Sequence, residues 1–313
     1  MSRQWVSYKN GNYTVSLNVF TGTKIRQNNL DYFEPDTVES MDIKITNKCG
    51  GDGYANLHCK FCHEGSSPFG QHGDILAPSF LDKLHPYTEL AIGGGNPLQH
   101  PDLDKFLEKC KERRHIPNMT VNQRHFLHEF DRIKKLYQDR LIFGLGISLV
   151  EVTPEFIEKV KQIPTAVIHV INGLITEDQL KKLKDNNLKI LVLGYKQVRR
   201  GERLYEKASE QIEQRKSMLK QLLPTIINEG WFQVISFDNL ALKQLDVRSQ
   251  MTEDEWTKFY MGDDGLEGSQ SSATMFIDLV ERKFAKNSCA PMDERYDLMD
   301  TAEDMFKFLR RGN

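Results

Sequence analysis

Three of the chain's five cysteines lie within one glycine-rich stretch, CGGDGYANLHCKFC, which runs from Cys49 to Cys62. Nine residues separate Cys49 from Cys59, and two separate Cys59 from Cys62. Thiolates at such short spacing bind zinc, hold iron–sulfur clusters or form a redox-active pair. The stretch is therefore the first candidate for a site that does chemistry.

Each of these three possibilities makes a different demand on the neighbouring residues. A structural zinc site needs four ligands; His58 and His63 are nearby, but no second pair of cysteines follows. A thioredoxin-like pair would open a helix, without a third cysteine upstream. Three thiolates without a fourth suit an iron–sulfur cluster in which one iron stays open to another ligand. The spacing favours the cluster and leaves zinc as the alternative.

The overall composition narrows the classes of function. Of 313 residues, 42 are basic and 44 are acidic, which gives a formal net charge of −2. A large nucleic acid is not expected as a partner, because many phosphate contacts need many cations. The N-terminus lacks a charged segment followed by an apolar run, and no stretch has the length of a membrane span. We therefore expect a cytoplasmic protein with no membrane partner, in which clustered cysteines stay reduced.

The elements that must position the cysteines follow a repeated strand–loop–helix pattern. The apolar runs predict strands over 41–46, 89–94, 118–123, 141–150, 165–171 and 188–195. Helices are predicted over 78–84, 102–113, 126–138, 154–161 and 177–186, and Thr153 and Thr176 are suitable N-caps. Strands rich in Val, Ile and Leu that alternate with helices indicate a parallel α/β fold, here a partial (β/α)6 barrel similar to a TIM barrel. The cysteine stretch leaves the C-terminal end of the first strand, which is where such folds place their chemistry.

The chain divides into three parts by pattern. Residues 1–40 are polar and turn-rich, with a short predicted hairpin, and form an N-terminal extension. Residues 41–195 form the barrel core. Residues 196–313 form a C-terminal α+β extension that covers the active site, with a long helix over 205–228 and strands over 231–237 and 274–280.

The cysteine stretch resembles the signature of the radical S-adenosylmethionine (radical SAM) superfamily. The residues that carry the resemblance are Cys49, Cys59 and Cys62, with the aromatic Phe61 directly before the last cysteine. The resemblance implies that the three thiolates hold a 4Fe–4S cluster, whose open iron chelates the amino and carboxylate groups of SAM, and that Phe61 touches the adenine. The family usually has three residues between the first two cysteines, and this chain has nine.

The resemblance also implies which positions contact SAM, most of them at predicted strand ends. The run GGGNP follows the second strand, where the family's glycine-rich stretch binds the SAM amino group through backbone carbonyls. In the fifth strand, His169 stands where the family has glycine. The residues implied in binding SAM are Phe61, Gly93, Gly94, Gly95, Asn96, Asn122, Ser148, Glu151, Ile171, Gly173 and Tyr195.

The chemistry implied by the resemblance is reductive cleavage of SAM to a 5′-deoxyadenosyl radical that abstracts hydrogen from a substrate. An external one-electron reductant of the flavodoxin or ferredoxin type is then needed. Cys110 and Cys289 are too few and too far apart for a second cluster of the usual kind. The substrate is a peptide or protein side chain, or alternatively a nucleotide or similar phosphorylated small molecule. A zinc-stabilised binding protein that is not an enzyme is the alternative of a different class.

Three features of the C-terminal part are candidates for the substrate site. The basic run that contains Arg199 and Arg200 leaves the last barrel strand and could hold a phosphate or carboxylate. The acidic turn at Asp263 and Asp264 could meet an amine or a guanidinium. Cys289 could return a hydrogen atom to a substrate radical. Each has a plainer alternative: basic runs and acidic turns are usually solvated surface, and a lone cysteine is usually structural.

Overall fold

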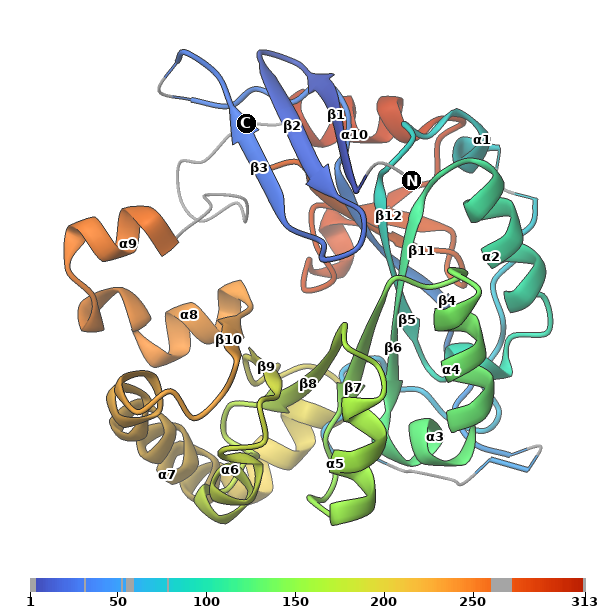
Figure 1. Ribbon diagram of the computed structural model, residues 1–313. Coiled ribbons are helices and arrows are strands. Elements are labelled where there is room, and N and C mark those ends of the chain that lie inside the picture. The colour runs from blue at the N-terminus through green and yellow to red at the C-terminus, as the bar shows by residue number, and fades with distance from the viewer. Residues whose placement is uncertain are drawn as a thin grey trace.

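The computed structural model describes residues 4–30, 32–51, 53–54, 59–77, 79–259 and 272–311 (Figure 1). The chain is built on a ten-stranded sheet in the order β10-β9-β8-β7-β6-β5-β4-β11-β12-β13. The eight strands from β10 to β11 in this order are parallel, and β12 and β13 are antiparallel additions at one edge. The strands are β4 (Ser40–Thr46), β5 (Glu89–Gly94), β6 (Ile116–Asn122), β7 (Gly144–Ser148), β8 (Ala166–Ile171), β9 (Lys189–Leu193), β10 (Val234–Phe237), β11 (Thr274–Asp278), β12 (Lys283–Ala285) and β13 (Tyr296–Asp297).

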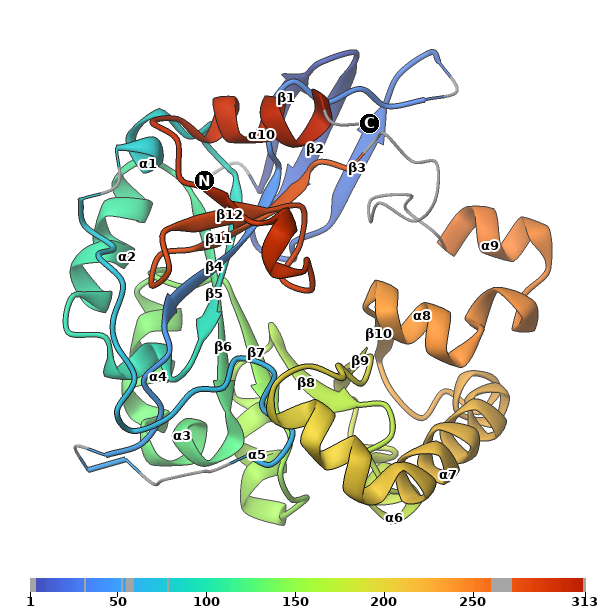
Figure 2. The same cartoon turned by 180° about the vertical axis from the view of Figure 1, so that it is seen from behind.

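Helices cover the outer face of this sheet, which curves into an open barrel (Figures 1 and 2). The α-helices are α1 (Phe80–Lys83), α2 (Leu103–Glu112), α3 (Gln123–His128), α4 (Phe130–Gln138), α5 (Pro154–Lys161), α6 (Glu177–Leu183), α7 (Arg200–Asn228), α8 (Asn239–Leu245), α9 (Glu253–Phe259) and α10 (Ala302–Arg311). Short 3-10 turns are η1 (Pro97–Gln99), η2 (Val247–Gln250) and η3 (Met292–Glu294). One continuous apolar core lies between sheet and helices, with Phe106, Phe126 and Phe156 fully buried in it. No helix of the described residues has both the length and the apolar composition needed to cross a membrane.

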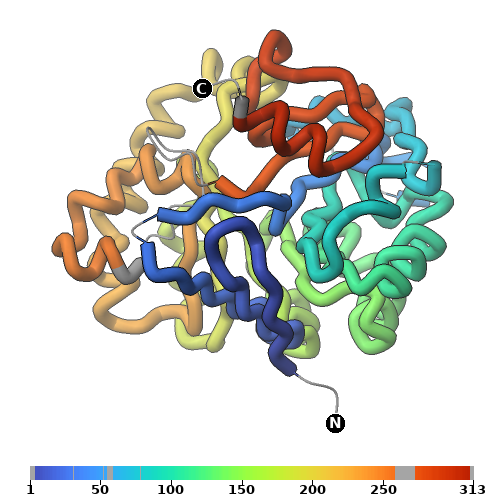
Figure 3. Tube along the Cα trace, turned by 90° about the horizontal axis from the view of Figure 1, so that it is seen from above, coloured from blue at the N-terminus to red at the C-terminus, as the bar shows by residue number. Residues whose placement is uncertain are grey.

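A separate three-stranded antiparallel sheet forms the N-terminal part: β1 (Trp5–Asn10), β2 (Tyr13–Asn18) and β3 (Lys24–Gln27). Viewed from above, this blue segment crosses the middle of the molecule, between α9 and the helices α1 and α2 (Figure 3). Two ion pairs attach it to the starts of β4 and β5: Arg26 pairs with the buried Glu39 at 2.9 Å, and the half-buried Lys24 pairs with Glu89 at 2.7 Å. The small sheet therefore closes the N-terminal end of the barrel.

The predicted fold class, a partial α/β barrel, is confirmed, and the barrel is open rather than closed. The two predicted N-caps are present: the side chain of Thr153 accepts a hydrogen bond from the Phe156 amide, and Thr176 forms a capping box with Gln179. The helix predicted over 126–138 is two helices, because Glu129 leaves helical geometry with φ −105° and ψ 24°. The strands predicted over 231–237 and 274–280 join the main sheet as β10 and β11, beside β9 and β4.

Candidate active site

A cavity of about 1160 Å³ lies against the inner face of the sheet. In β8 and β9 alternate residues line it, as expected where side chains of a strand point in turn to either face, and in β4, β5 and β6 consecutive residues contribute. From β6, β7 and β8 these include Thr120, Gly146 and His169. The lining continues from the cysteine stretch at the C-terminal ends of the strands to Leu17–Gly22, the β2–β3 turn, at the opposite end. The cavity thus runs along the barrel and touches all three predicted metal ligands.

Cys49 lies on the wall of this cavity, and its backbone is firmly held. Its N–H donates to the Ser67 carbonyl at 2.8 Å. The next residue, Gly50, donates its N–H to Gln99 Oε1 at 2.9 Å, and its carbonyl accepts from Gln99 Nε2 at 3.1 Å. The side chain of Gln99 therefore clamps the peptide that follows Cys49, so the position of this thiol is set by the fold.

Cys59 and Cys62 line the same cavity and belong to one tight turn. The Cys62 N–H donates to the Cys59 carbonyl at 3.1 Å. Two arginines at the start of α7 hold the residues that follow: Arg199 Nη1 donates to the Glu64 carbonyl, and Arg200 Nη2 donates to the Ser66 carbonyl at 2.6 Å. The predicted anion-binding arginines thus contact the segment directly after the cysteine stretch in this structure.

The three thiols are near enough for the charge of one to raise the pKa of another. Burial raises the pKa of Cys49 to about 11, with further contributions from Cys59 and Cys62 and an opposing one from Arg200. Burial also raises the pKa of Cys59, as does the charge of Cys62, while Arg200 and Arg124 lower it. All three are free thiols, half-buried on the cavity wall. Metal binding would replace their protons and remove this mutual repulsion.

The donor set therefore has the chemistry that an iron–sulfur cluster requires: three free thiols facing one cavity. Within the described ranges, no three His, Cys, Asp or Glu side chains are arranged as a ready metal site. The three thiols line the same cavity, but their sulfurs do not surround a common point as the ligands of a bound metal do. His58, one of the two histidines considered for zinc, lies outside the described residues, and His63 pairs with Glu64 at 3.2 Å.

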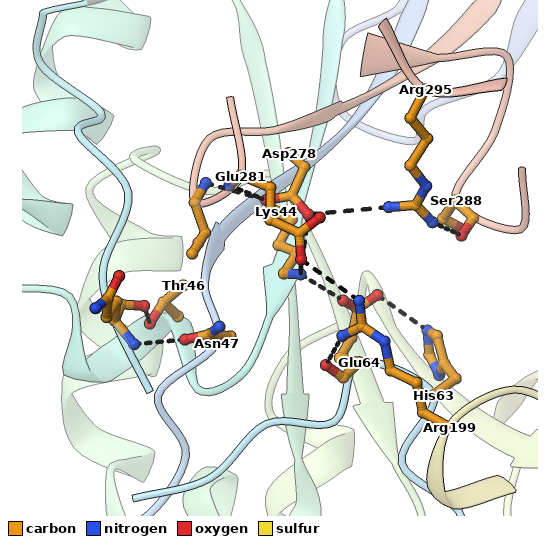
Figure 4. A network of polar contacts seen from close by, with 12 residues as sticks. Lys44, Thr46, Asn47, His63, Glu64, Arg199, Asp278, Glu281, Ser288 and Arg295 are labelled. Carbon is orange, nitrogen blue, oxygen red and sulfur yellow. Dashed lines mark hydrogen bonds and ion pairs between the residues drawn. The ribbon is translucent and has the colours of Figure 1, made fainter. Parts of the chain in front are cut away.

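A buried ionic network connects the residues directly after the cysteine stretch to the sheet (Figure 4). Lys44 on β4 places its Nζ 2.9 Å from Asp278 Oδ2 at the end of β11 and 3.1 Å from Glu64 Oε2. Burial alone would lower the pKa of Lys44, but Glu64 and Asp278 raise it above its ordinary value. Burial would raise the pKa of Glu64, but the hydrogen bond from His63 and the charge of Lys44 lower it to about 2. These contacts keep Lys44 and Glu64 in their ionised forms.

The predicted SAM-contact residues separate into two groups. Phe61, Gly93, Gly94, Gly95, Asn122, Ser148 and Ile171 line the cavity, whereas Asn96, Glu151, Gly173 and Tyr195 do not. Tyr195 is buried, and its backbone N–H and carbonyl both bond to the Gln244 side chain at 2.9 Å. Gly173, at φ +89°, packs against Ile212 of α7.

The glycine run after β5 has a structural reason of its own. A Cβ on Gly94 would collide with the Thr46 carbonyl, and a Cβ on Gly95 would collide with the Lys48 carbonyl. Only Gly93 has open space in front of it. The backbone of this run therefore lies directly against the residues between β4 and Cys49, which brings the two predicted cofactor segments together.

The substrate-side candidates are also separated by the structure. Cys289 is exposed and lines the cavity beside Asn287 and Ser288. Arg199 and Arg200 do not line the cavity and instead bond to the segment directly after the cysteine stretch. Asp263 and Asp264 lie outside the described residues.

Three residues at or beside the cavity were not among the predicted site residues. His125 on α3 places Nε2 3.6 Å from Cys49 Sγ. His169 lies in the middle of the cavity wall, and burial lowers its pKa to about 4, so the ring is neutral. Asp42 is solvent-accessible where it faces the cavity, and the surrounding protein atoms raise its pKa against the opposing charge of Lys196. A charged residue inside the apolar strand MDIKIT was the available signal for Asp42.

Fold and site together define a class of protein: an open parallel α/β barrel with three cysteines beside its central cavity. No protein-family model and no curated protein matches the sequence. Among solved structures, the chain is similar to Streptococcus suis SuiB bound to the precursor peptide SuiA, with a TM-score of 0.62 and 12% identity over 100% of this chain and 89% of that one. It is also similar to SuiB bound to S-adenosylmethionine, with a TM-score of 0.60 and 11% identity over 95% of this chain and 85% of that one. At this identity the likeness shows a shared fold, which agrees with the partial α/β barrel predicted from the sequence.

Proposed function

We propose that the chain is a radical SAM enzyme in which Cys49, Cys59 and Cys62 hold a 4Fe–4S cluster. The observation that carries the proposal is that these three free thiols line one cavity at the C-terminal ends of parallel strands. The SuiB structure with S-adenosylmethionine, which has the same fold, supports a SAM site in this cavity.

The cofactors supply the hard chemistry, and the chain supplies binding, orientation and shielding. When bound, the cluster and SAM supply an electron and a 5′-deoxyadenosyl radical that abstracts hydrogen from the substrate. The backbone at Gly93 offers polar groups close to the cysteines, and Ser148 and Asn122 offer side-chain oxygens from neighbouring strand ends. Phe61 provides an apolar surface on the cavity wall for the adenine. The N-terminal sheet closes the opposite end of the cavity and limits the entry of water there.

The substrate that we propose is a peptide or protein side chain. SuiB has been solved with a precursor peptide, which supports this class. A cavity of about 1160 Å³ is larger than a pocket for one small ligand, so a side chain can enter beside SAM. A phosphorylated small molecule has less support, because the guanidiniums of Arg199 and Arg200 bond to protein carbonyls.

Cys289 fits the role of hydrogen-atom donor because its exposed thiol faces the same cavity. In that role it would return a hydrogen atom to the substrate radical, and a reductant would restore the thiol afterwards. Cys289→Ala should then keep SAM cleavage and lose product. Unchanged product formation by this variant would reject the role.

The enzyme also needs an external one-electron reductant of the flavodoxin or ferredoxin type. We place the protein in the cytoplasm, where five free cysteines stay reduced.

The decisive experiment is anaerobic reconstitution of the full chain with iron and sulfide, followed by reduction and addition of SAM. We expect about four iron atoms per chain and formation of 5′-deoxyadenosine. Both should be lost in Cys49→Ala and kept in Cys110→Ala, because Cys110 is buried in the core away from the cavity. A colourless protein with one tightly bound zinc, no cluster and no cleavage would instead identify the cysteine stretch as a structural clip.

A further inference from the structure

One histidine outside the predicted motifs lies directly beside the first cysteine. His125 Nε2 is 3.6 Å from Cys49 Sγ, and the His125 residue is only 2% exposed. The two residues are 76 positions apart, so only the fold brings them together. Among the described residues, this contact is the only hydrogen bond to the sulfur of Cys49, Cys59 or Cys62.

The contact is built from both sides. His125 lies in the first turns of α3, which begins directly after β6 and is capped by Asn122, whose side chain accepts from the Arg124 amide. The ring of Tyr54 packs edge-on against the imidazole at 5.5 Å. Cys49 is fixed independently by the Ser67 carbonyl. The distance between ring and sulfur is therefore set by packing and backbone hydrogen bonds rather than by a flexible side chain.

The direction of the hydrogen bond follows from the chemistry of the sulfur. A cysteine that ligates iron has lost its proton, so its sulfur can only accept. An attractive contact then requires the imidazole to carry its proton on Nε2. Hydrogen bonds to ligating sulfurs stabilise the more negative, reduced state of a cluster and so raise its reduction potential.

We propose that His125 donates an N–H···S hydrogen bond to Cys49 in the loaded protein and raises the potential of the cluster. This inference rests on the proposed function. His125 is a positioning and tuning residue here, because it acts through Cys49 and touches neither SAM nor substrate.

The test compares three variants after reconstitution to equal iron and sulfide content. His125→Phe keeps a buried ring against Tyr54 and removes the donor, and His125→Gln places an amide N–H where Nε2 was. His128→Phe is the matched control, since His128 also packs on Tyr54, at 5.4 Å, without reaching a cysteine. Redox titration followed by electron paramagnetic resonance should give a more negative midpoint for His125→Phe, recovery toward wild type for His125→Gln, and no shift for His128→Phe.

A second measurement uses the wild-type protein and so does not depend on cluster incorporation into a variant. Hyperfine spectra of the reduced wild-type protein in H₂O and D₂O should show an exchangeable proton close to the cluster and only weak coupling to nitrogen. An unchanged midpoint in His125→Phe, or no exchangeable proton, would overturn the inference while leaving the proposed function intact. Strong nitrogen coupling would make His125 a direct ligand and would overturn it as well. A wild-type chain that takes up no cluster would refute the proposed function itself.

Discussion

Replacement of Lys44 by methionine tests whether the buried network supports the cysteine stretch. Lys44→Met keeps the length of the side chain and removes its charge, which leaves Asp278 and Glu64 without the ammonium at 2.9 and 3.1 Å. The side chains of Lys44 and Asp278 are 1% and 0% exposed, so water cannot replace the lost partner. Breaking a buried ion pair from one side costs about 3–5 kcal/mol.

We expect the lower end of that range, because both carboxylates keep other partners. Asp278 Oδ1 still accepts from the amides of Val280 and Glu281 at 3.0 Å, and Glu64 keeps His63 at 3.2 Å. The loss should therefore be about 3 kcal/mol of unfolding free energy. This difference in unfolding free energy should be fully present below the ordinary pKa of lysine. It should disappear as pH rises through the raised pKa of Lys44, because the wild type then loses the same charge.

The assay is urea unfolding of the metal-free, reduced protein at neutral pH. Lys105→Met is the matched control: Lys105 also pairs with an aspartate, Asp102 at 3.6 Å, but its side chain is 73% exposed. An exposed pair of this kind contributes less than about 1 kcal/mol. Adding Asp278→Asn to Lys44→Met should recover part of the loss, because it removes the buried carboxylate that has lost its lysine. If Lys44→Met costs no more than Lys105→Met, the network does not carry the stability assigned to it.

Three further changes test other parts of the structure. Gly146→Ala places a Cβ against the His169 ring and the Thr120 hydroxyl, and overpacking of this kind should cost about 1–3 kcal/mol. Adding His169→Ala should recover part of the midpoint of thermal unfolding, because it removes the larger of the two clashes. Glu39→Gln breaks the buried pair with Arg26 and should cost about 3 kcal/mol at neutral pH. Although burial would raise the pKa of Glu39, Arg26 lowers it, so the difference in urea midpoint from wild type should shrink as pH falls through that lowered value. Arg200→Met releases the Ser66 carbonyl, directly after the cysteine stretch, and should lower iron retention during gel filtration. Full retention would contradict a role of Arg200 in holding this segment.

Local patterns in the sequence were sufficient for the elements and their order. The strand predicted over 89–94 is β5, and the helix predicted over 154–161 is α5, because alternation, capping and proline placement act over a few residues. The helix α8 was missed, although Asp238 is its N-cap and accepts from the Ala241 amide at 2.7 Å.

The contacts that organise the site could not be predicted, because they join distant parts of the chain. Lys44 and Asp278 are 234 positions apart, and Cys49 and His125 are 76 apart. The lone lysine in the apolar strand MDIKIT does signal a buried partner, but no local rule says which carboxylate it meets. The cysteine spacing, in contrast, is local, and it identified the thiols that the fold gathers.

The basic run after β9 shows how position changes the meaning of a charge. From the sequence, Arg199 and Arg200 suit an anion of the substrate, and that use stays a prediction. In the structure, Arg200 donates to the Ser66 carbonyl, and its charge opposes the burial that raises the pKa values of Cys49 and Cys59. Positive charge beside thiols favours the thiolates that a metal needs. Charge reversal at these arginines should therefore reduce cluster assembly more than it reduces substrate affinity. Measuring both losses in the same variant separates the two roles.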